Sequence, residues 1–543
     1  MVNKGGSPRP DQPYMPHVAL APSAERDLTS DTHMPAFRTN NGVGGRKMEG
    51  QDALVIVDPI SSGAVLALLG MQRGYRLIAV YSEGLEAELK AMVPTECREQ
   101  GLHFDHVIEH TGDVPATAAT LRSLFASPSS PPPPASPPLV LKSLLVGCES
   151  GVGLYDALIQ ELRQSTIPER VEGREGGEEG GKEDTPFPPS TLGGNVFALS
   201  CARRNKYLMG EAIRSAGLRA AKQLMTASWE EVPPFLETCR RPSPSPSAPS
   251  SLKVVLKPLS SAGSDGVVFA SSKEEAREAF ERILASTNVF GERNTAVLIQ
   301  EYLQGTEFVV DSISHEGEHR VTAIWRYDKR PLNGAAFVYY GLRLWEGEDG
   351  REMDWALARY AHACLDALGI RNGFSHAEVM WLEGEAGGAG APCLVEVGAR
   401  PHGGEGTFVS LTAEAIGYNQ LSVALDLIRD PQALAGIPLL PPPLKAHAAE
   451  VCLVSRKSGR LLRHFLTEHV AGNTLPSLKS VEMHVEVGDY LKKTVDMLSS
   501  PGSAILAHGD ARVLERDYEC IHEMDLFLVE GGGGGGRRKG KGV

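Results

Sequence analysis

The sequence is poor in several features that would place it in a specialised class. Its eight cysteines are scattered and include no Cys-x-x-Cys pair, which argues against a disulfide framework or a zinc site and favours reduced, buried thiols. No apolar run reaches the about 18 residues that a transmembrane helix needs. Acidic residues outnumber basic ones and the formal net charge is -14, so the positive surface typical of nucleic-acid binding is not expected.

Residues 1–50 also lack the apolar core of a secretory signal. They are rich in Pro, Gly, Ser and Asn and are predicted to be disordered, as are the Gly-rich, basic residues 530–543. Acidic residues among the arginines give a transit peptide little support, although organelle targeting stays open. We expect a cytoplasmic protein that binds neither membrane nor nucleic acid.

Three stretches of low complexity interrupt the rest of the chain. Residues 126–138 and 241–251 are rich in Pro and Ser, and residues 169–190 are charged and rich in Gly and Pro. Such compositions cannot bury a core, so we interpret these stretches as surface insertions in loops.

Short apolar segments after residue 50 predict a parallel sheet built from βαβ units. Gly151 and Gly153 suggest a dinucleotide-binding loop, but Asp156 stands in place of the third glycine, so nicotinamide binding is disfavoured. The elements predicted here are strands at 53–57, 76–81, 107–109 and 139–146 and a helix at 64–73.

The stretch from Lys253 to Ala270 is the most informative part of the sequence. Apolar segments at its two ends predict strands, joined by the small residues Ser260–Gly266. This loop contains two glycines and can bring backbone amides close to an anion, while Lys257 stands just before it. A P-loop carries its lysine after the glycines and continues into a helix, so this would be a different nucleotide-binding device. A plain β-hairpin with an exposed lysine is the alternative.

A second lysine, Lys206, lies in the first turn of a predicted helix. The helical pattern begins at Asn205 and places Tyr207, Leu208 and Ile213 on one face. Taken alone, Lys206 is equally well interpreted as a solvated residue at the start of a helix.

Two acidic residues flank a predicted turn. Residues 295–302 and 307–314 are predicted strands, with the second returning from the turn, and Glu301 and Glu307 lie at their facing ends. A third strand is predicted at 320–327.

Two further carboxylates stand within apolar segments that predict antiparallel strands, Glu378 in 373–382 and Glu396 in 392–397. An acid in a buried strand is costly unless it is paired or binds a metal, and two on neighbouring strands can share a divalent ion such as Mg²⁺. Arg400 follows the second strand, where it can reach an anion beside that metal. Exposure of both acids on a half-solvated strand face is the alternative.

The remaining candidates carry less information. His376 and His402 lie near the acidic pair, and structural and functional roles are equally open for them. Residues 414–430 predict one helix. Residues 444–529 predict an α+β module without a catalytic constellation, with strands at 448–454, 480–487 and 504–507.

Five segments in a fixed order give the chain a specific resemblance. Together they resemble the ATP-grasp superfamily of carboxylate–amine ligases, and within it the branch that contains L-amino-acid ligases and carnosine synthase. The segments are RRNKYLM at 203–209, VVLKPLSSAGSDGV at 254–267, IQEYLQGTEFVVD at 299–311, HAEVMW at 376–381 and LVEVGARPHGG at 394–404.

The resemblance implies a multidomain fold of the α/β and α+β classes. A Rossmann-like domain would cover residues 51–190, and an ATP-grasp domain would cover 191–443 with an insertion near 241–251. The small C-terminal α+β module would cover 444–529.

The resemblance also implies a role for each candidate residue. Lys206 and Lys257 would contact the phosphates of ATP, and Arg400 would steady the transferred phosphoryl group with help from Lys329. The loop residues Ser260, Ser261, Gly263, Ser264 and Gly266 would also contact the phosphates. Adenine would be bound by Glu301, Tyr302 and Leu303, and the ribose by Glu307. Mg²⁺ (or Mn²⁺) would be bound by Glu378 and Glu396, and the substrate by His376 and His402.

The implied reaction has two steps: a carboxylate takes the γ-phosphoryl group of ATP to give an acyl phosphate and ADP, and an amine then displaces phosphate to form an amide. Many ATP-grasp enzymes have a metal-binding Asn at the position of Gly398 in this chain. The amino-acid-ligase branch resembles this chain in having Gly there, and the coordination of a second metal ion stays open. The substrates would be small molecules, amino acids in the first place, and a homodimer is left open.

Other functions stay open beside this one. One is another ATP-grasp ligase, such as a biotin-carboxylase-like enzyme, although no Met-Lys biotin-attachment sequence is present. A second is a non-catalytic ATP-binding protein. A scaffold organised by the Pro-rich stretches would not account for the five ordered segments.

Overall fold

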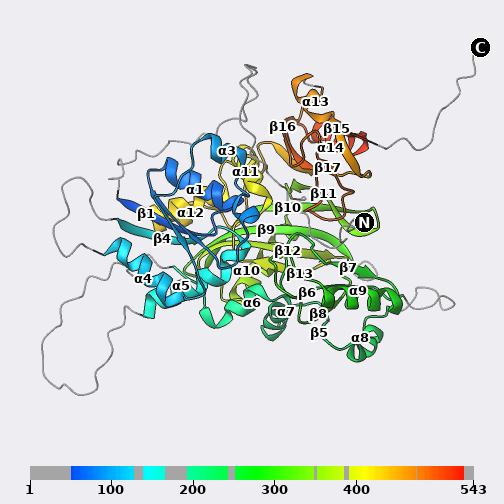
Figure 1. The fold of residues 1–543 in the computed structure, drawn as a ribbon, viewed down its shortest axis with the longest axis horizontal. Coiled ribbons are helices and arrows are strands. Elements are labelled where there is room, and N and C mark those ends of the chain that lie inside the picture. The colour runs from blue at the N-terminus through cyan, green and yellow to red at the C-terminus, as the bar shows by residue number, and fades with distance from the viewer. Residues whose placement is uncertain are drawn as a thin grey trace, which may run out of the picture.

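The computed structural model describes residues 51–126, 139–164, 193–241, 251–347, 351–383, 390–472 and 474–530. The predictions for both chain ends and for most of the low-complexity stretches lie outside the described residues. In Figure 1 a parallel sheet with its helices lies at the left, a large sheet crosses the centre, and a small sheet lies at the lower right.

The first sheet confirms the βαβ prediction. Its strands are parallel, in the order β3-β2-β1-β4. The apolar residues of β1 are fully buried, as expected for a parallel strand covered on both faces. The elements are β1 (Asp52–Val57), α1 (Ser62–Gln72), β2 (Arg76–Tyr81), α2 (Ala87–Lys90), α3 (Thr95–Glu99), β3 (His106–Glu109), α4 (Val114–Phe125), β4 (Val140–Val146), the 3-10 turn η1 (Glu149–Gly151) and α5 (Val152–Gln164).

The small sheet is antiparallel, in the order β5-β8-β6-β7, and packs its apolar face against helices α8 and α9 around a separate core. Ser272 caps α9 by accepting a hydrogen bond from the amide of Glu275. The elements are α6 (Ser200–Arg204), α7 (Lys206–Ser215), β5 (Gln223–Thr226), α8 (Val232–Thr238), β6 (Val254–Pro258), β7 (Val268–Ala270), α9 (Lys273–Ala285) and β8 (Val297–Glu301).

The large sheet has eight strands in the order β13-β12-β9-β10-β11-β14-β18-β16. Its core is continuous with that of the first sheet, and α12 lies between α1 and the strands β9 and β12. The elements are β9 (Gly305–His315), β10 (Glu318–Leu332), β11 (Ala335–Leu344), α10 (Glu352–Ala367), β12 (Gly373–Leu382), β13 (Ala391–Gly398), α11 (Thr407–Ala415), α12 (Gln420–Arg429), β14 (His447–Cys452), β16 (Leu478–Met483) and β18 (Gly502–His508).

The C-terminal residues have a core of their own, yet they also extend the large sheet. Strand β14 pairs with β11, and β18 and β16 follow it, so the main sheet passes from the central region into the C-terminal one. The other elements here are β15 (Gly459–His464), α13 (Leu466–Gly472), β17 (Tyr490–Leu491), α14 (Ala511–Glu523) and β19 (Phe527–Val529).

Several predicted elements were wrong in extent. Residues 414–430 form parts of two helices, because Gly417 adopts φ 106° and Asn419 starts a new helix with a capping box. Strand β10 runs on to Leu332, so Lys329 lies inside it. Leu208 is 40% exposed, and Met209 takes its place on the buried face of α7.

The turn after Glu301 does not make a hairpin. Strand β8 pairs with β5 and β6, while β9 pairs with β10 and β12, so the chain crosses from the small sheet to the large one there. A Cβ at Gly305 would lie 2.0 Å from the carbonyl oxygen of Trp381, which explains the glycine at the crossing.

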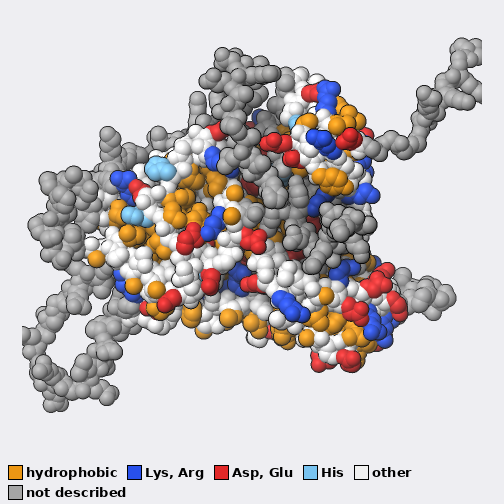
Figure 2. All heavy atoms as spheres, viewed as in Figure 1, with side chains coloured by type: hydrophobic (Ala, Val, Ile, Leu, Met, Phe, Trp, Pro, Cys, Tyr) orange, Lys and Arg blue, Asp and Glu red, His pale blue; other side chains and the backbone are white. Residues whose placement is uncertain are grey.

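Figure 2 shows acidic and basic side chains interleaved over α8 and α9 rather than a stripe of one sign. No helix in the described part of the chain combines the length and the apolar character needed to cross a membrane.

Candidate active site

A cleft of about 900 Å³ is lined by residues of both the small sheet and the large sheet. Most of the residues singled out in the sequence line it, although they come from distant parts of the chain. Those residues are Lys206, Lys257, Ser261, Gly263, Ser264, Glu301, Tyr302, Leu303, Glu307, Lys329, Glu378 and Glu396. Ser260, Gly266, His376, Arg400 and His402 lie outside the lining.

The two lysines enter the cleft from one side. Asn205 caps α7, which places Lys206 in the first turn, and its Nζ donates to Glu396 Oε1 at 2.6 Å and to the carbonyl of Ser261 at 2.7 Å. Lys257, at the end of β6, is only 6% exposed, unlike the exposed lysine of a plain hairpin. Burial lowers the pKa of Lys257 to about 8, and Lys206 adds to this shift while Glu396 opposes it.

The loop Ser260–Gly266 has the backbone shape that its glycines suggest. Gly263, Ser264 and Gly266 adopt φ between 64° and 67°, and a Cβ on Gly266 would lie 2.9 Å from Pro258 Cγ. Asp265 accepts hydrogen bonds from Ser261 Oγ at 2.6 Å and from the amide of Val289 at 2.9 Å, which fixes the loop's base.

The crossing between the sheets forms the apolar end of the cleft. The ring of Tyr302 stacks on Phe337 with centroids 6.3 Å apart and meets Phe269 edge-on at 5.2 Å. Among the described residues no hydrogen-bond partner is found for the backbone amide or carbonyl of Leu303. A flat heterocycle with donor and acceptor edges fits such a place.

Glu307 and Lys329 form an ion pair inside the cleft, with Lys329 Nζ 2.7 Å from Glu307 Oε1. The ammonium also lies over the rings of Tyr327 and Tyr339, at 4.6 and 4.5 Å from their centroids. Burial alone would lower the pKa of Lys329, but the Glu307 carboxylate outweighs it and raises the pKa, so Lys329 stays charged.

Glu378 and Glu396 are direct cross-strand partners on β12 and β13. Like charges placed opposite each other destabilise a sheet, and the Lys206 ammonium, 2.6 Å from Glu396 Oε1, offsets part of this repulsion. Their side chains are 18% and 28% exposed and face the cleft, not a solvated sheet face. Burial alone would raise the pKa of Glu378. The nearby Lys329, His376 and Arg400 outweigh burial and hold this pKa well below its usual range.

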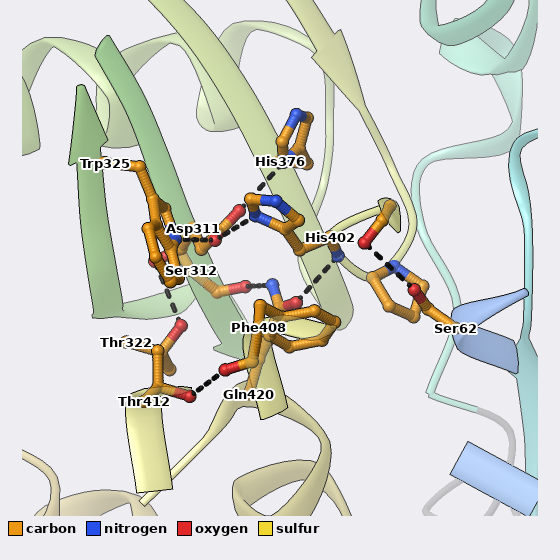
Figure 3. Close-up of polar contacts among 12 residues, drawn as sticks. Ser62, Asp311, Ser312, Thr322, Trp325, His376, His402, Phe408, Thr412 and Gln420 are labelled. Carbon is orange, nitrogen blue, oxygen red and sulfur yellow. Dashed lines mark hydrogen bonds and ion pairs between the residues drawn. The ribbon is translucent and has the colours of Figure 1, made fainter. Parts of the chain in front are cut away.

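The two histidines belong to a buried network around Asp311 (Figure 3). His376 Nδ1 lies 2.9 Å from Asp311 Oδ1, while His402 Nδ1 and Trp325 Nε1 lie 2.6 and 2.8 Å from Oδ2. The amide of His402 donates to Gln420, which in turn donates to the carbonyls of β9 and β12. The network therefore ties the segment after β13 to the middle of the large sheet.

The same three side chains, Asp311, His376 and His402, are the one group among the described residues with ligand atoms close enough for a metal. Both oxygens of Asp311 are already used by N–H donors, and these bonds account for the cluster without an ion. Burial would raise the pKa of Asp311, but the two imidazoles hold it well below its usual range. His376 Nε2 faces Tyr327 Oη at 3.5 Å and Glu378 Oε1 at 3.6 Å, so the network ends beside the acidic pair.

Arg400 lies just beyond β13. Its Nε donates to Glu149 Oε2 at 3.1 Å. Burial alone would lower the pKa of Arg400, but the nearby negative charge, Glu149 first, outweighs burial and raises it. Its charge is one of those that lower the pKa of Glu378.

The sequence analysis missed four residues of the site or its support. Phe337 and Tyr339 line the cleft from β11, and the run of aromatic and β-branched residues in 335–344 is a strand signal that could have found them. Asp311 and Glu149 have no such local signal, because the histidine partners of Asp311 and the arginine partner of Glu149 lie 65 to 251 positions away in the chain.

The donor set fits a nucleotide with a divalent metal. The paired carboxylates offer the oxygen ligands that Mg²⁺ prefers, and the lysines and loop amides offer positive charge for phosphates. The apolar end suits a base, because the Leu303 backbone has no hydrogen-bond partner among the residues that the structure describes.

Comparison with known proteins agrees with this assignment. Residues 250–408 match the family model of the ATP-grasp domain. The chain is 28% identical over 480 residues to dapdiamide A synthase of Enterobacter agglomerans, covering 88% of this chain and 97% of that protein.

Two solved structures share the fold. The L-amino acid ligase of Bacillus licheniformis superposes with a TM-score of 0.61 at 16% identity, covering 89% of this chain and all of that one. The biotin carboxylase domain of the Hydrogenobacter thermophilus 2-oxoglutarate carboxylase, solved with MgADP, gives a TM-score of 0.52 at 11% identity, covering 88% and 90%. The chain therefore contains an ATP-grasp domain and shares the fold of the L-amino acid ligase.

Proposed function

We propose that this protein is an ATP-dependent ligase that joins the carboxylate of one amino acid to the amine of a second small molecule, with release of ADP and phosphate. The observation that carries the proposal is the pair Glu378 and Glu396, opposed on neighbouring strands and lining one cleft together with Lys206 and Lys257. The near full-length similarity to dapdiamide A synthase supports amide formation between small molecules.

In the first step a carboxylate oxygen of one substrate attacks the γ-phosphorus of ATP, and the bond to the β-phosphate oxygen breaks. We assign Glu378 and Glu396 to Mg²⁺, with Mn²⁺ as the alternative, and Lys206 and Lys257 to the phosphates. Bound metal supplies charge neutralisation to the phosphates. The protein's part is alignment and positive charge, since phosphoryl transfer needs little covalent help.

In the second step the amine nitrogen attacks the acyl carbon, the carbon–oxygen bond to phosphate breaks, and the amine loses a proton. An acyl phosphate hydrolyses readily, so water must be kept out. The loop Ser260–Gly266 is placed for this task because it borders the cleft and Gly263 comes close to Met497 of the C-terminal region.

The remaining assignments follow the cleft from its apolar end. We assign Glu301, Tyr302 and Leu303 to adenine and Glu307 to the ribose, with Lys329 holding Glu307. His376 and His402 are assigned to the substrate side, behind the acidic pair. A homodimer and a cytoplasmic location stay predictions of the sequence, as does the division into domains.

The test is ADP release from Mg·ATP with a panel of single and paired amino acids, with the product identified by mass spectrometry. We expect release that requires one particular pair and yields one amide per ADP. Glu396→Gln should abolish it, while Glu318→Gln, an exposed acid at the far end of β10, should leave it unchanged. ADP release that needs bicarbonate and biotin instead would favour the carboxylase alternative and overturn the proposal.

A further inference from the structure

The carboxylate of Glu149 is the partner of Arg400, although it belongs to the other side of the molecule. Glu149 lies in the turn η1, directly after β4 of the first sheet, whereas Arg400 follows β13 of the large sheet. Arg400 Nε donates to Glu149 Oε2 at 3.1 Å, and the two side chains are only 20% and 13% exposed. The contact joins residues 251 positions apart in the chain.

The turn that carries Glu149 is firmly held. Arg204 Nη1 donates to the carbonyls of Glu149 and Ser150, at 2.6 and 3.0 Å. Ser150 Oγ donates to the buried Asp58 at 2.6 Å, which also accepts from the amide and hydroxyl of Ser82. The turn is thus anchored to the carboxyl ends of β1 and β2, which fixes the backbone position from which the Glu149 side chain extends.

The turn that carries Glu149 also lies at a place in the first sheet where α/β proteins commonly bind ligands. Strand β1 lies between β2 and β4, so the chain connections leave in opposite directions there. The crevice outside the carboxyl ends of strands at such a switch point is a general location for binding sites. Here Arg400 reaches that end of the first sheet through its hydrogen bond to Glu149.

Gly398 shows that this pair fills a defined space. A Cβ on Gly398 would lie 2.9 Å from Glu149 Oε2 and 3.0 Å from Arg400 Nε. The backbone of Gly398 is ordinary strand without a positive φ, so its backbone angles do not require glycine. The absence of a side chain matters here because it leaves room for the neighbouring side chains. Any larger residue at 398 would push the guanidinium and the carboxylate from their positions.

We propose that Glu149 is a positioning residue for the ligase reaction: it fixes the Arg400 guanidinium just beyond β13, and Gly398 is glycine because this ion pair occupies the space beside it. The inference rests on the proposed function, since it takes Arg400 to act on the transferred phosphoryl group. It adds that the first sheet, which contributes no residue to the nucleotide cleft, completes the site.

The experiment compares Glu149→Gln, Gly398→Ala and Arg400→Lys, singly and combined. Glu149→Gln keeps the size of the side chain and removes its charge, while Gly398→Ala displaces the pair and leaves both charges. We expect each to lower kcat at least about tenfold, with KM for ATP and the melting temperature near wild type, because a small misplacement of a catalytic group is costly. With Arg400→Lys already present, Glu149→Gln should cost little more.

A readout without substrates is the ratio of Mg·ATP to Mg·ADP affinity in the full chain. We expect Glu149→Gln and Arg400→Lys to lower this ratio and the double variant to be no worse than Arg400→Lys. Losses that multiply in the double variant would overturn the inference, as would a raised KM for a substrate at unchanged kcat. Failure of the proposed function would appear differently, as a wild-type protein that makes no amide, and the affinity ratio would still decide the role of Glu149.

Discussion

Glu450, on β14, is a buried carboxyl group whose hydrogen bond comes from a neutral donor, the hydroxyl of Thr407 at 2.9 Å. Burial raises the pKa of Glu450 from 4.5 to about 7, and Glu405 and Glu482 add to the shift. The folded chain therefore binds this proton more tightly than the unfolded chain does. The stabilisation is complete below about pH 4.5 and is lost as the pH rises through about 7.

We expect Glu450→Gln to remove this pH dependence. The free energy of unfolding of the wild type should fall by up to about 3 kcal/mol between pH 5 and 8 from this group alone. Chemical denaturation at several pH values measures the slope. Glu523→Gln, at an exposed position of α14, is the matched control and should keep the wild-type slope; an unchanged slope in Glu450→Gln would contradict the assignment.

Asp311 offers a second prediction at this scale. In Asp311→Asn the amide can accept at one oxygen only, so at least one of the buried N–H groups of His376, His402 and Trp325 loses its acceptor. Breaking a buried charged network usually costs about 3 kcal/mol or more, which denaturant unfolding would detect. Asp366→Asn is the control: Asp366 also pairs with a histidine, His319, but is 68% exposed, and its loss should cost less than about 1 kcal/mol. Equal losses at both sites would sink this account.

At the scale of elements, the loop Ser260–Gly266 depends on backbone angles that only glycine adopts easily. Gly266→Ala would place a Cβ against Pro258 at a φ of 67°. Such strain costs about 1–2 kcal/mol, so we expect Mg·ATP affinity to fall about tenfold, as measured by calorimetry. Gly436→Ala, where a Cβ would meet nothing within 4 Å, should bind like the wild type. Normal affinity in Gly266→Ala would show that the loop does not need this shape.

The elements that sequence analysis predicted well are those whose signal is local. The pair β12 and β13, with Glu378 opposite Glu396, follows from two apolar segments and a short connection. The change of sheet at Gly305 was not predictable, because a turn between two apolar segments looks the same whether the strands pair with each other or with others. Leu208 was misplaced for a similar reason: tertiary packing chose Met209 for the core although both are apolar.

The candidate site shows the same division. Lys206, Lys257, Glu378 and Glu396 lie in short segments with recognisable spacing, so the sequence located them and the fold brought them into one cleft. Glu149 and Asp311 act through partners that only the complete fold supplies, so no window of sequence identifies them.

At the scale of the whole molecule, the C-terminal region is tied to the large sheet in three ways. β14 pairs along the edge of β11, and Arg343 of β11 lies over the ring of Tyr518 with its centroid 3.9 Å away. Asn333, in the turn before β11, donates to the carbonyls of Ser455 and Thr494. The region is therefore more than an appended module.

We expect a chain ending at residue 443 to unfold or aggregate, because it would expose the edge of β11 together with Val338 and Tyr340, which pack against Val454. Light scattering and the melting temperature would show this. A chain ending at residue 530 removes none of the described structure and serves as the control. A stable, monomeric protein ending at 443 would contradict the role given to β14.

The bridge between Arg241 and Ser251 has a practical consequence. Each backbone amide of this pair donates to the other's carbonyl, at 3.0 and 3.1 Å, so the fold continues across two positions that are ten apart in the chain. What the chain does between those two points costs the fold little, since each doubling of a loop's length adds only about 0.6 kcal/mol of closure entropy. An affinity tag or a fluorescent reporter could therefore be inserted between Arg241 and Ser251, next to the small sheet.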